Sequence, residues 1–125
     1  MTERTSDWLD SATLQMLTDL GERRGKDLLA QLYGLFQTQG PSGIAELRRA
    51  LSEGDAVAFT EAAHSLKGSY RSLGTPRLAE IAADLEAAGR AGRLDGVASE
   101  VDDLESAFHH TDQALGDFIA SRGTT

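Results

Sequence analysis

The stretch FTEAAHSLKGSYRSLG, residues 59–74, decides the fold of this chain. Its apolar residues recur at intervals of three and four, which is the period of an amphipathic α-helix. On a helical wheel at about 100° per residue they gather on one side, which we expect to be the core face. They are Phe59, Ala63, Leu66, Tyr70 and Leu73.

His64 lies on the opposite side of this helix. It points about 140° away from Phe59 and is predicted to face water, with Lys67 and Gly68 one turn along on either side. A lysine at this spacing can pair with a phosphoryl group on imidazole, whose charge is about −1.5 to −2. Glycine inside a helix costs roughly 1 kcal/mol relative to alanine, so this glycine indicates close approach of a partner. An ordinary surface histidine and a glycine at a helix crossing are the alternatives.

The run AHSLKGS at residues 63–69, followed by Leu73-Gly74, resembles the signature of the histidine-containing phosphotransfer (HPt) domain family. The resemblance implies an all-α, antiparallel four-helix bundle, here with a short additional N-terminal helix. Such a domain carries a phosphoryl group between receiver aspartates in two-component signalling. We therefore expect a free-standing, bacterial-type phosphotransfer protein in which residues 1–125 form a single HPt domain with an ordered core over about 8–121.

Composition sets the wider limits. The chain has 125 residues, 40 % of them hydrophobic, with no cysteine and a formal charge of −8. This length suits one domain with one modest core, and the absence of cysteine excludes disulfides and thiolate metal sites. The negative charge disfavours nucleic acid and anionic membrane as partners. No apolar run could span a bilayer and the first ten residues do not resemble a signal peptide, so we expect a cytoplasmic monomer.

Apolar periodicity predicts helices over residues 11–20, 25–39, 56–73, 76–89 and 96–120, and the second continues, kinked or briefly broken at 40–43, towards residue 51. The expected helix signals are Asp10 and Asp55 as N-caps, Gly21, Gly54 and Gly74 as stops, and Thr75 as a capping hydroxyl before Pro76. Trp8 and Leu9 can fold back on the first helix as a hydrophobic staple. Residues 1–6 and 121–125 are expected to be frayed.

The turn at Thr75 predicts a partner for the histidine. A residue eleven positions before this turn should lie level with one eleven positions after it, which pairs His64 with Glu86. The HPt family places a glutamine or glutamate that hydrogen-bonds the histidine at this position. A carboxylate that accepts from Nδ1–H fixes the tautomer and leaves Nε2 free to attack phosphorus. A solvated glutamate on an exposed face is the alternative.

The resemblance also implies site residues and partners. His64 is then the phosphoacceptor, with Lys67, Gly68 and Glu86 completing the catalytic set, in a phosphocarrier that is not itself an enzyme. The implied partners are response-regulator receiver domains and a sensor or hybrid histidine kinase. This chain is expected to bind no cofactor or metal, because Mg²⁺ is expected on the receiver domain.

We expect a partner to contact the surface around His64 and the first helix, through Val57, Thr60, Glu61, Arg71 and Leu14. Basic residues near the histidine would suit a carboxylate-rich partner pocket, and they are Lys67, Arg71, Arg77 and Arg90. His109 and His110 are predicted to be surface residues, because adjacent positions on a helix do not face the same way.

Two other functions are weighed against the phosphocarrier. The spacing Glu61-x-x-His64 occurs in di-metal four-helix bundles, but such a site needs a second copy and inward-facing ligands. A helical adaptor that binds receiver or kinase domains without carrying phosphate is the other alternative, expected if the histidine or lysine were missing. Histidine-kinase activity is excluded, since no glycine-rich nucleotide-binding segment is present.

Overall fold

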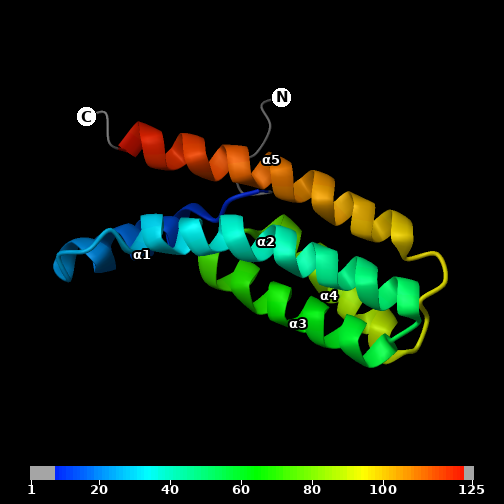
Figure 1. Ribbon diagram of the computed structural model, residues 1–125. Coiled ribbons are helices and arrows are strands. Elements are labelled where there is room, and N and C mark those ends of the chain that lie inside the picture. The colour runs from blue at the N-terminus through cyan, green and yellow to red at the C-terminus, as the bar shows by residue number, and fades with distance from the viewer. Residues whose placement is uncertain (1–7, 123–125) are drawn as a thin grey trace.

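The computed structural model describes residues 8–122, which form five α-helices and no β-strand. The helices are α1 (Ser11–Arg23), α2 (Leu28–Glu53), α3 (Ala56–Leu73), α4 (Pro76–Arg90) and α5 (Ala98–Arg122). Helices α2 to α5 alternate in direction as an antiparallel four-helix bundle, and α1 lies at one end of it beside α2 (Figure 1). The predicted fold class is therefore confirmed.

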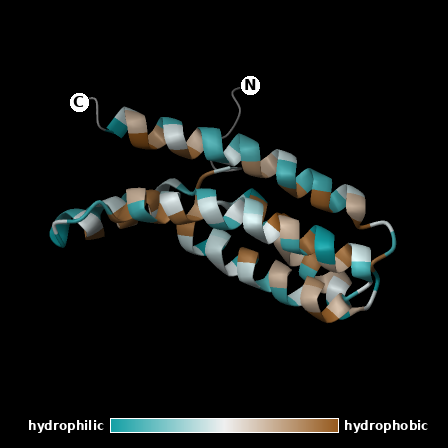
Figure 2. Cartoon of the chain, in the orientation of Figure 1, coloured by the Kyte–Doolittle hydropathy of each residue, from teal (hydrophilic) through white to brown (hydrophobic). Residues whose placement is uncertain are grey.

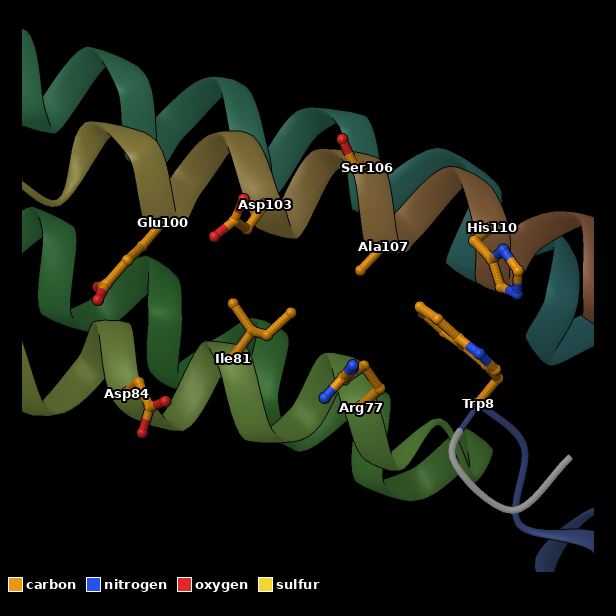
Figure 3. A pocket seen from close by; sticks show the side chains of 9 residues that line it. All are labelled: Trp8, Arg77, Ile81, Asp84, Glu100, Asp103, Ser106, Ala107 and His110. Atoms are coloured by element: carbon orange, nitrogen blue, oxygen red, sulfur yellow. The ribbon is translucent and has the colours of Figure 1, made fainter. Parts of the chain in front are cut away.

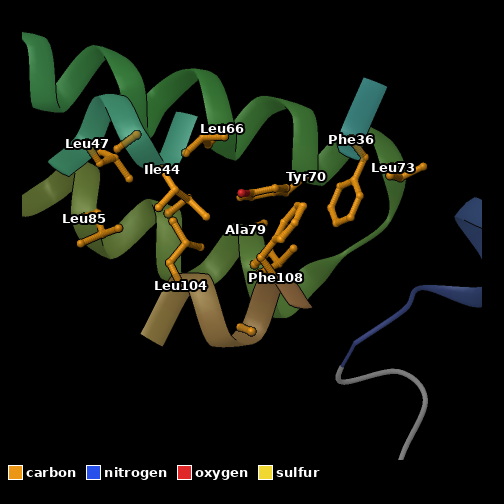
Figure 4. Close-up of a cluster of buried hydrophobic side chains, with 14 of the residues drawn as sticks. Phe36, Ile44, Leu47, Leu66, Tyr70, Leu73, Ala79, Leu85, Leu104 and Phe108 are labelled. Atoms are coloured by element: carbon orange, nitrogen blue, oxygen red, sulfur yellow. The ribbon is translucent and has the colours of Figure 1, made fainter. Parts of the chain in front are cut away.

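Each helix has a hydrophobic and a hydrophilic side (Figure 2), and the hydrophobic sides meet in one core. The predicted core face of α3 is confirmed, because Phe59, Ala63, Leu66, Tyr70 and Leu73 are all buried. Aromatic rings from three helices pack together there (Figure 4), with Phe36 of α2 stacked at 4.6 Å on Phe108 of α5. Burial of one face of α3 leaves its opposite face to solvent, which is where the sequence placed the histidine.

The sequence predicted that the helix is kinked or briefly broken at residues 40–43, and the structure has no break there, since α2 is continuous from Leu28 to Glu53. Proline inside a helix costs about 3 kcal/mol or more, yet Pro41 lies within this one. The two glycines beside Pro41 are required by packing. A Cβ on Gly40 would overlap the ring of Phe108, and a Cβ on Gly43 would overlap Leu66. These glycines let α5 and α3 approach α2 closely, so they serve packing and do not end the helix.

The boundary of α1 also differs from the prediction. Gly21 does not stop this helix, which continues to Arg23, and the left-handed residue is Gly25 with φ of +68°. Gly21 is buried against the start of α2, where a Cβ would meet the backbone of Lys26 and Leu28. Its role is again close approach.

The last helix extends further than predicted. Residues 121 and 122 complete α5, and Arg122 binds Asp27, the N-cap of α2, at 2.5 Å. The prediction of frayed ends at 1–6 and 123–125 lies outside the described residues.

The turn between α3 and α4 has the predicted position but not the predicted cap. Gly74 ends α3 with φ of +77°, as expected for a left-handed C-terminal residue. The buried hydroxyl of Thr75 donates to the carbonyl of Tyr70 at 2.9 Å and does not cap α4. The backbone N–H of Asp10 donates to the carbonyl of Gly74 at 2.8 Å, which ties the start of α1 to this turn.

The two residues before α1 differ from each other. Leu9 is buried in the core, whereas Trp8 is half-buried and packs on another part of the molecule. Its ring lies 4.0 Å from that of His110 on α5 and under the guanidinium of Arg77 on α4. Trp8 therefore links the N-terminal segment to α4 and α5.

Candidate functional site

His64 stands on the outer face of α3 with 65 % of its side chain exposed. The helix around it is set by Asp55, whose carboxylate accepts from Ala58 N–H at 3.0 Å, and by Gly74 at the other end. Both predicted ends of this helix are confirmed. The exposed ring can be reached by another protein.

Glu86 of α4 lies beside the imidazole. Its Oε2 is 2.9 Å from His64 Nδ1, so the register predicted from the turn at Thr75 is confirmed. The alternative that Glu86 is one more solvated glutamate is wrong, because only 5 % of its side chain is exposed.

Two cations accompany this buried carboxylate. Lys67 Nζ lies 2.6 Å from Glu86 Oε1, and Arg90 Nη2 lies 2.6 Å from Oε2. A buried charge is tolerated when it is paired and hydrogen-bonded, and both oxygens of Glu86 are occupied. The hydrogen bond from Lys67, followed by that from Arg90, lowers the pKa of Glu86 to about 2.

The charge of Glu86 determines which nitrogen of the His64 imidazole carries the proton. At neutral pH a carboxylate with this pKa is ionised and can only accept hydrogen bonds. Nδ1 of His64 must therefore carry the proton that lies between the two groups. In the neutral ring the lone pair is then on Nε2, the nitrogen directed away from Glu86.

Lys67 and Arg90 differ from what the sequence suggested. Lys67 is only 19 % exposed and binds Glu86, so it does not stand free beside the imidazole. Arg90 was counted only among the basic residues around His64, yet it contacts the same carboxylate oxygen as the ring does. The available signal was the i,i+4 spacing from Glu86 to Arg90 on a helix. Arg77 does not join this group, since it lies over Trp8.

Gly68 is exposed and open. A Cβ built on it would meet no atom within 4 Å, in contrast to Gly40 and Gly43. Packing inside the bundle therefore does not require glycine at this position, and the helix-crossing alternative is excluded.

A groove of about 460 Å³ begins beside Gly68, between α2 and α3. Leucine and aromatic side chains provide much of its lining, among them Leu32, Leu35, Phe36 and Leu73. Leu35 is 52 % exposed and adds accessible apolar surface to this groove. The face next to the histidine thus combines an open backbone position with accessible apolar surface.

The residues predicted to contact a partner fall into two groups. Val57, Glu61 and Arg71 are exposed on α3, and Thr60 is half-buried with its hydroxyl donating to Ala56 O at 2.7 Å. The assignment of Leu14 is wrong, because its side chain is fully buried in the core. The position on α1 that does expose an apolar side chain is Met16, at 52 %.

The remaining candidates lie elsewhere. His109 and His110 are both exposed on α5, as predicted, and His110 packs on Trp8. Within residues 8–122 no group of three or more histidine, aspartate or glutamate side chains is arranged to hold a metal ion. Over the same range no helix is both long and apolar enough to cross a membrane.

Comparisons with known proteins agree on one family. The family model for the Hpt domain matches residues 31–114, more than half of the chain, so this chain belongs to the Hpt domain family. No curated protein sequence matches.

Two solved structures are similar to this chain. Histidine-containing phosphotransfer protein B (HptB) from Pseudomonas aeruginosa PAO1 superposes with a TM-score of 0.79 at 27 % identity, over 87 % of this chain and 91 % of that one. The HPT domain of the Hpt sensor hybrid histidine kinase from Shewanella gives a TM-score of 0.64 at 14 % identity, over 90 % and 97 % of the two chains. The second likeness concerns the fold alone.

Proposed function

We propose that this protein is a phosphocarrier of a two-component phosphorelay, in which His64 takes a phosphoryl group from a receiver aspartate and passes it to another. The observation that carries the proposal is the bond between His64 Nδ1 and Glu86, which leaves Nε2 as the exposed nucleophile. Membership of the Hpt family and the likeness to a histidine-containing phosphotransfer protein support it.

The chemistry uses groups already in place. The lone pair of Nε2 forms the N–P bond while the P–O bond of the acyl phosphate breaks, and the aspartate carboxylate leaves with that electron pair. The proton on Nδ1 stays on the ring, and the positive charge that the ring gains faces Glu86. Lys67 and Arg90 together carry two positive charges against the single negative charge of Glu86, and the excess positive charge offsets part of the charge of the arriving phosphoryl group. Mg²⁺ belongs to the receiver domain in this scheme.

Docking of the receiver is assigned to the face formed by α2 and α3. Gly68 allows a second backbone to come close, and the groove with Leu35 offers apolar surface beside it. Arg71, on the next turn of α3, forms no ion pair within residues 8–122 and is available to an acidic partner. A sensor or hybrid histidine kinase upstream, the monomeric state and the cytoplasmic location remain predictions from the sequence.

The direct experiment mixes the purified protein with a receiver domain whose aspartate carries radioactive phosphate, and follows the label. Transfer to the protein, and from it to a second receiver, is the expected result. A protein that binds the phosphorylated receiver but gains no label would instead be the adaptor considered from the sequence.

A variant of Gly68 tests the docking face separately from the chemistry. Gly68→Gln has room in the isolated protein, so the melting temperature should hold or rise. Its long side chain should separate the two backbones and sharply slow transfer from a receiver. Phosphorylation by acetyl phosphate, which needs no protein docking, should suffer much less. Equal loss with both donors would place the fault at His64 itself and contradict the assigned docking face.

A further inference from the structure

A second groove runs between α4 and α5, with a volume of about 610 Å³ (Figure 3). None of the phosphotransfer residues lines it. Ile81 and Ala107 provide apolar side chains within it, and the indole of Trp8 closes one end. Its volume lies in the range of ligand-binding clefts.

Acidic side chains from both helices line the rest of this groove. Asp84 comes from α4, and Glu100 and Asp103 come from α5 (Figure 3); all three are exposed. None of the three forms an ion pair within residues 8–122. Like charges around one groove repel, and a cation bound among them would relieve that repulsion.

Two other carboxylates of α5, outside the groove, do form ion pairs. Asp102 and Glu105, on the side facing α2, are both bound by Arg48, at 2.9 and 2.5 Å. Arg48 thus pairs with the carboxylates on one side of α5, whereas the arginine that lines the groove, Arg77, lies over Trp8 and forms no ion pair with Asp84, Glu100 or Asp103. Another molecule can provide the positive charge that pairs with these three carboxylates.

The indole at the end of the groove is held in place. His110 packs on it at 4.0 Å and Arg77 lies 5.6 Å from the ring centroid. The apolar side chains beside this aromatic wall suit lysine and arginine, whose stems are apolar while their charged ends reach the acidic rims.

We propose that the groove between α4 and α5 binds a basic, partly apolar segment of a partner protein. Charge complementarity selects the occupant: Asp84, Glu100 and Asp103 bind its cationic groups, and Ile81, Ala107 and Trp8 pack on its apolar stems. The phosphotransfer face stays open, because Glu86 contacts His64 of α3 and does not line the groove, whereas Asp84 lines it. A partner bound here can hold the carrier while His64 serves its receivers. This inference does not depend on the proposed function.

The test uses a labelled synthetic peptide of repeated Lys-Leu-Ala units and a matched peptide with glutamate in place of each lysine. The groove variant combines Asp84→Asn, Glu100→Gln and Asp103→Asn. Its control combines Glu22→Gln, Asp95→Asn and Asp117→Asn, which are exposed residues outside the groove. Both variants lose three negative charges, so a net charge of −8 becomes −5 in each. Binding is measured at physiological salt, together with the emission of Trp8, the one tryptophan in the sequence.

The basic peptide should bind the wild type and the control variant equally and shift the emission of Trp8, and the acidic peptide should not bind. The groove variant should bind the basic peptide about tenfold more weakly or worse. Equal binding by the two variants would show general attraction to an acidic protein and overturn the proposal. Binding without a change at Trp8, or no binding to the wild type, would overturn it as well. Circular dichroism of each variant confirms that it is folded.

Discussion

The two sides of α4 treat negative charge in opposite ways. Glu86, on the side facing α3, is buried and contacts Lys67, Arg90 and His64. Asp84, two residues earlier and on the side facing α5, is exposed and forms no ion pair within the described chain. Two residues along a helix correspond to a rotation of about 200°, which is enough to change the neighbouring helix entirely.

The contrast teaches that a carboxylate takes its role from the helix that it faces. On one side α3 provides the cation Lys67 and the imidazole of His64, and the result is a closed site with a defined proton position. On the other side α5 provides further carboxylates, and the result is an open acidic groove. Each side also has one exposed histidine, His64 or His110, so the comparison can be tested by paired substitutions.

The largest expected difference is between those two histidines. His64→Gln should abolish phosphorylation by a phosphorylated receiver, because Nε2 is the proposed nucleophile. His110→Gln should leave phosphorylation unchanged and alter only the emission of Trp8, whose ring it contacts. On the wild type the label should be acid-labile and alkali-stable, as a P–N bond is. Labelling that survives in His64→Gln with unchanged helicity would contradict the assignment.

The second difference concerns the cations on the two sides. Lys67→Ala should slow phosphotransfer by roughly tenfold or more, because the phosphoryl group loses a charge that stabilises it in the transition state. Arg77→Ala removes a cation from the other side of α4 and should leave the rate unchanged. Single-turnover transfer from a labelled receiver measures both. If the two variants transfer equally well, Lys67 acts only as a structural partner of Glu86.

The third difference is in stability. The pKa of Glu86 is about 2, against an ordinary value of 4.5, so its ion pairs stabilise the folded protein fully above about pH 4.5. At neutral pH Glu86→Gln should lower the free energy of unfolding by on the order of 2 kcal/mol. This is less than the full pKa shift of Glu86 implies, because Arg90 is largely in solvent. This loss should shrink as the pH falls from about 4.5 to 2.

Asp84→Asn is the matched control for Glu86→Gln. It also removes one negative charge from α4, but from a residue that forms no ion pair within residues 8–122. Its stability should equal that of the wild type within about 0.5 kcal/mol across that pH range. Urea denaturation at a series of pH values measures both variants. A stability difference for Glu86→Gln that does not change with pH would mean that packing, and not charge, accounts for it.

The smallest expected effect is at Gly68. Gly68→Ala should stabilise the protein by about 0.5 to 1 kcal/mol, because the site is helical, exposed and open. Gly40→Ala should do the opposite and destabilise by about 1 to 3 kcal/mol, since its Cβ would overlap Phe108. Thermal denaturation compares the two directly. Destabilisation by Gly68→Ala would mean that α3 is oriented differently from the arrangement described above.

Much of the site could be predicted from the sequence, because the local signals there agree. The period of α3, the caps at Asp55 and Gly74, and the turn at Thr75 all fix positions along the chain. Helix geometry then carries those positions to a contact, and His64 meets Glu86 as expected. Errors arose where one local signal has two meanings. Gly21 was interpreted as a helix end and the glycines near Pro41 as a kink or brief break, and they proved to be contact points inside helices.

The sequence by itself determined the bundle, the exposed histidine and its carboxylate partner, because helical periodicity and turn residues act over a few positions of the chain. Only the tertiary structure decided that Leu14 is buried, that Lys67 binds Glu86, and that Asp84 lines an acidic groove. Those outcomes depend on which helix lies opposite each side chain. A pattern within one helix states which residues share a face, but the charge and volume that this face meets come from residues far away in the sequence.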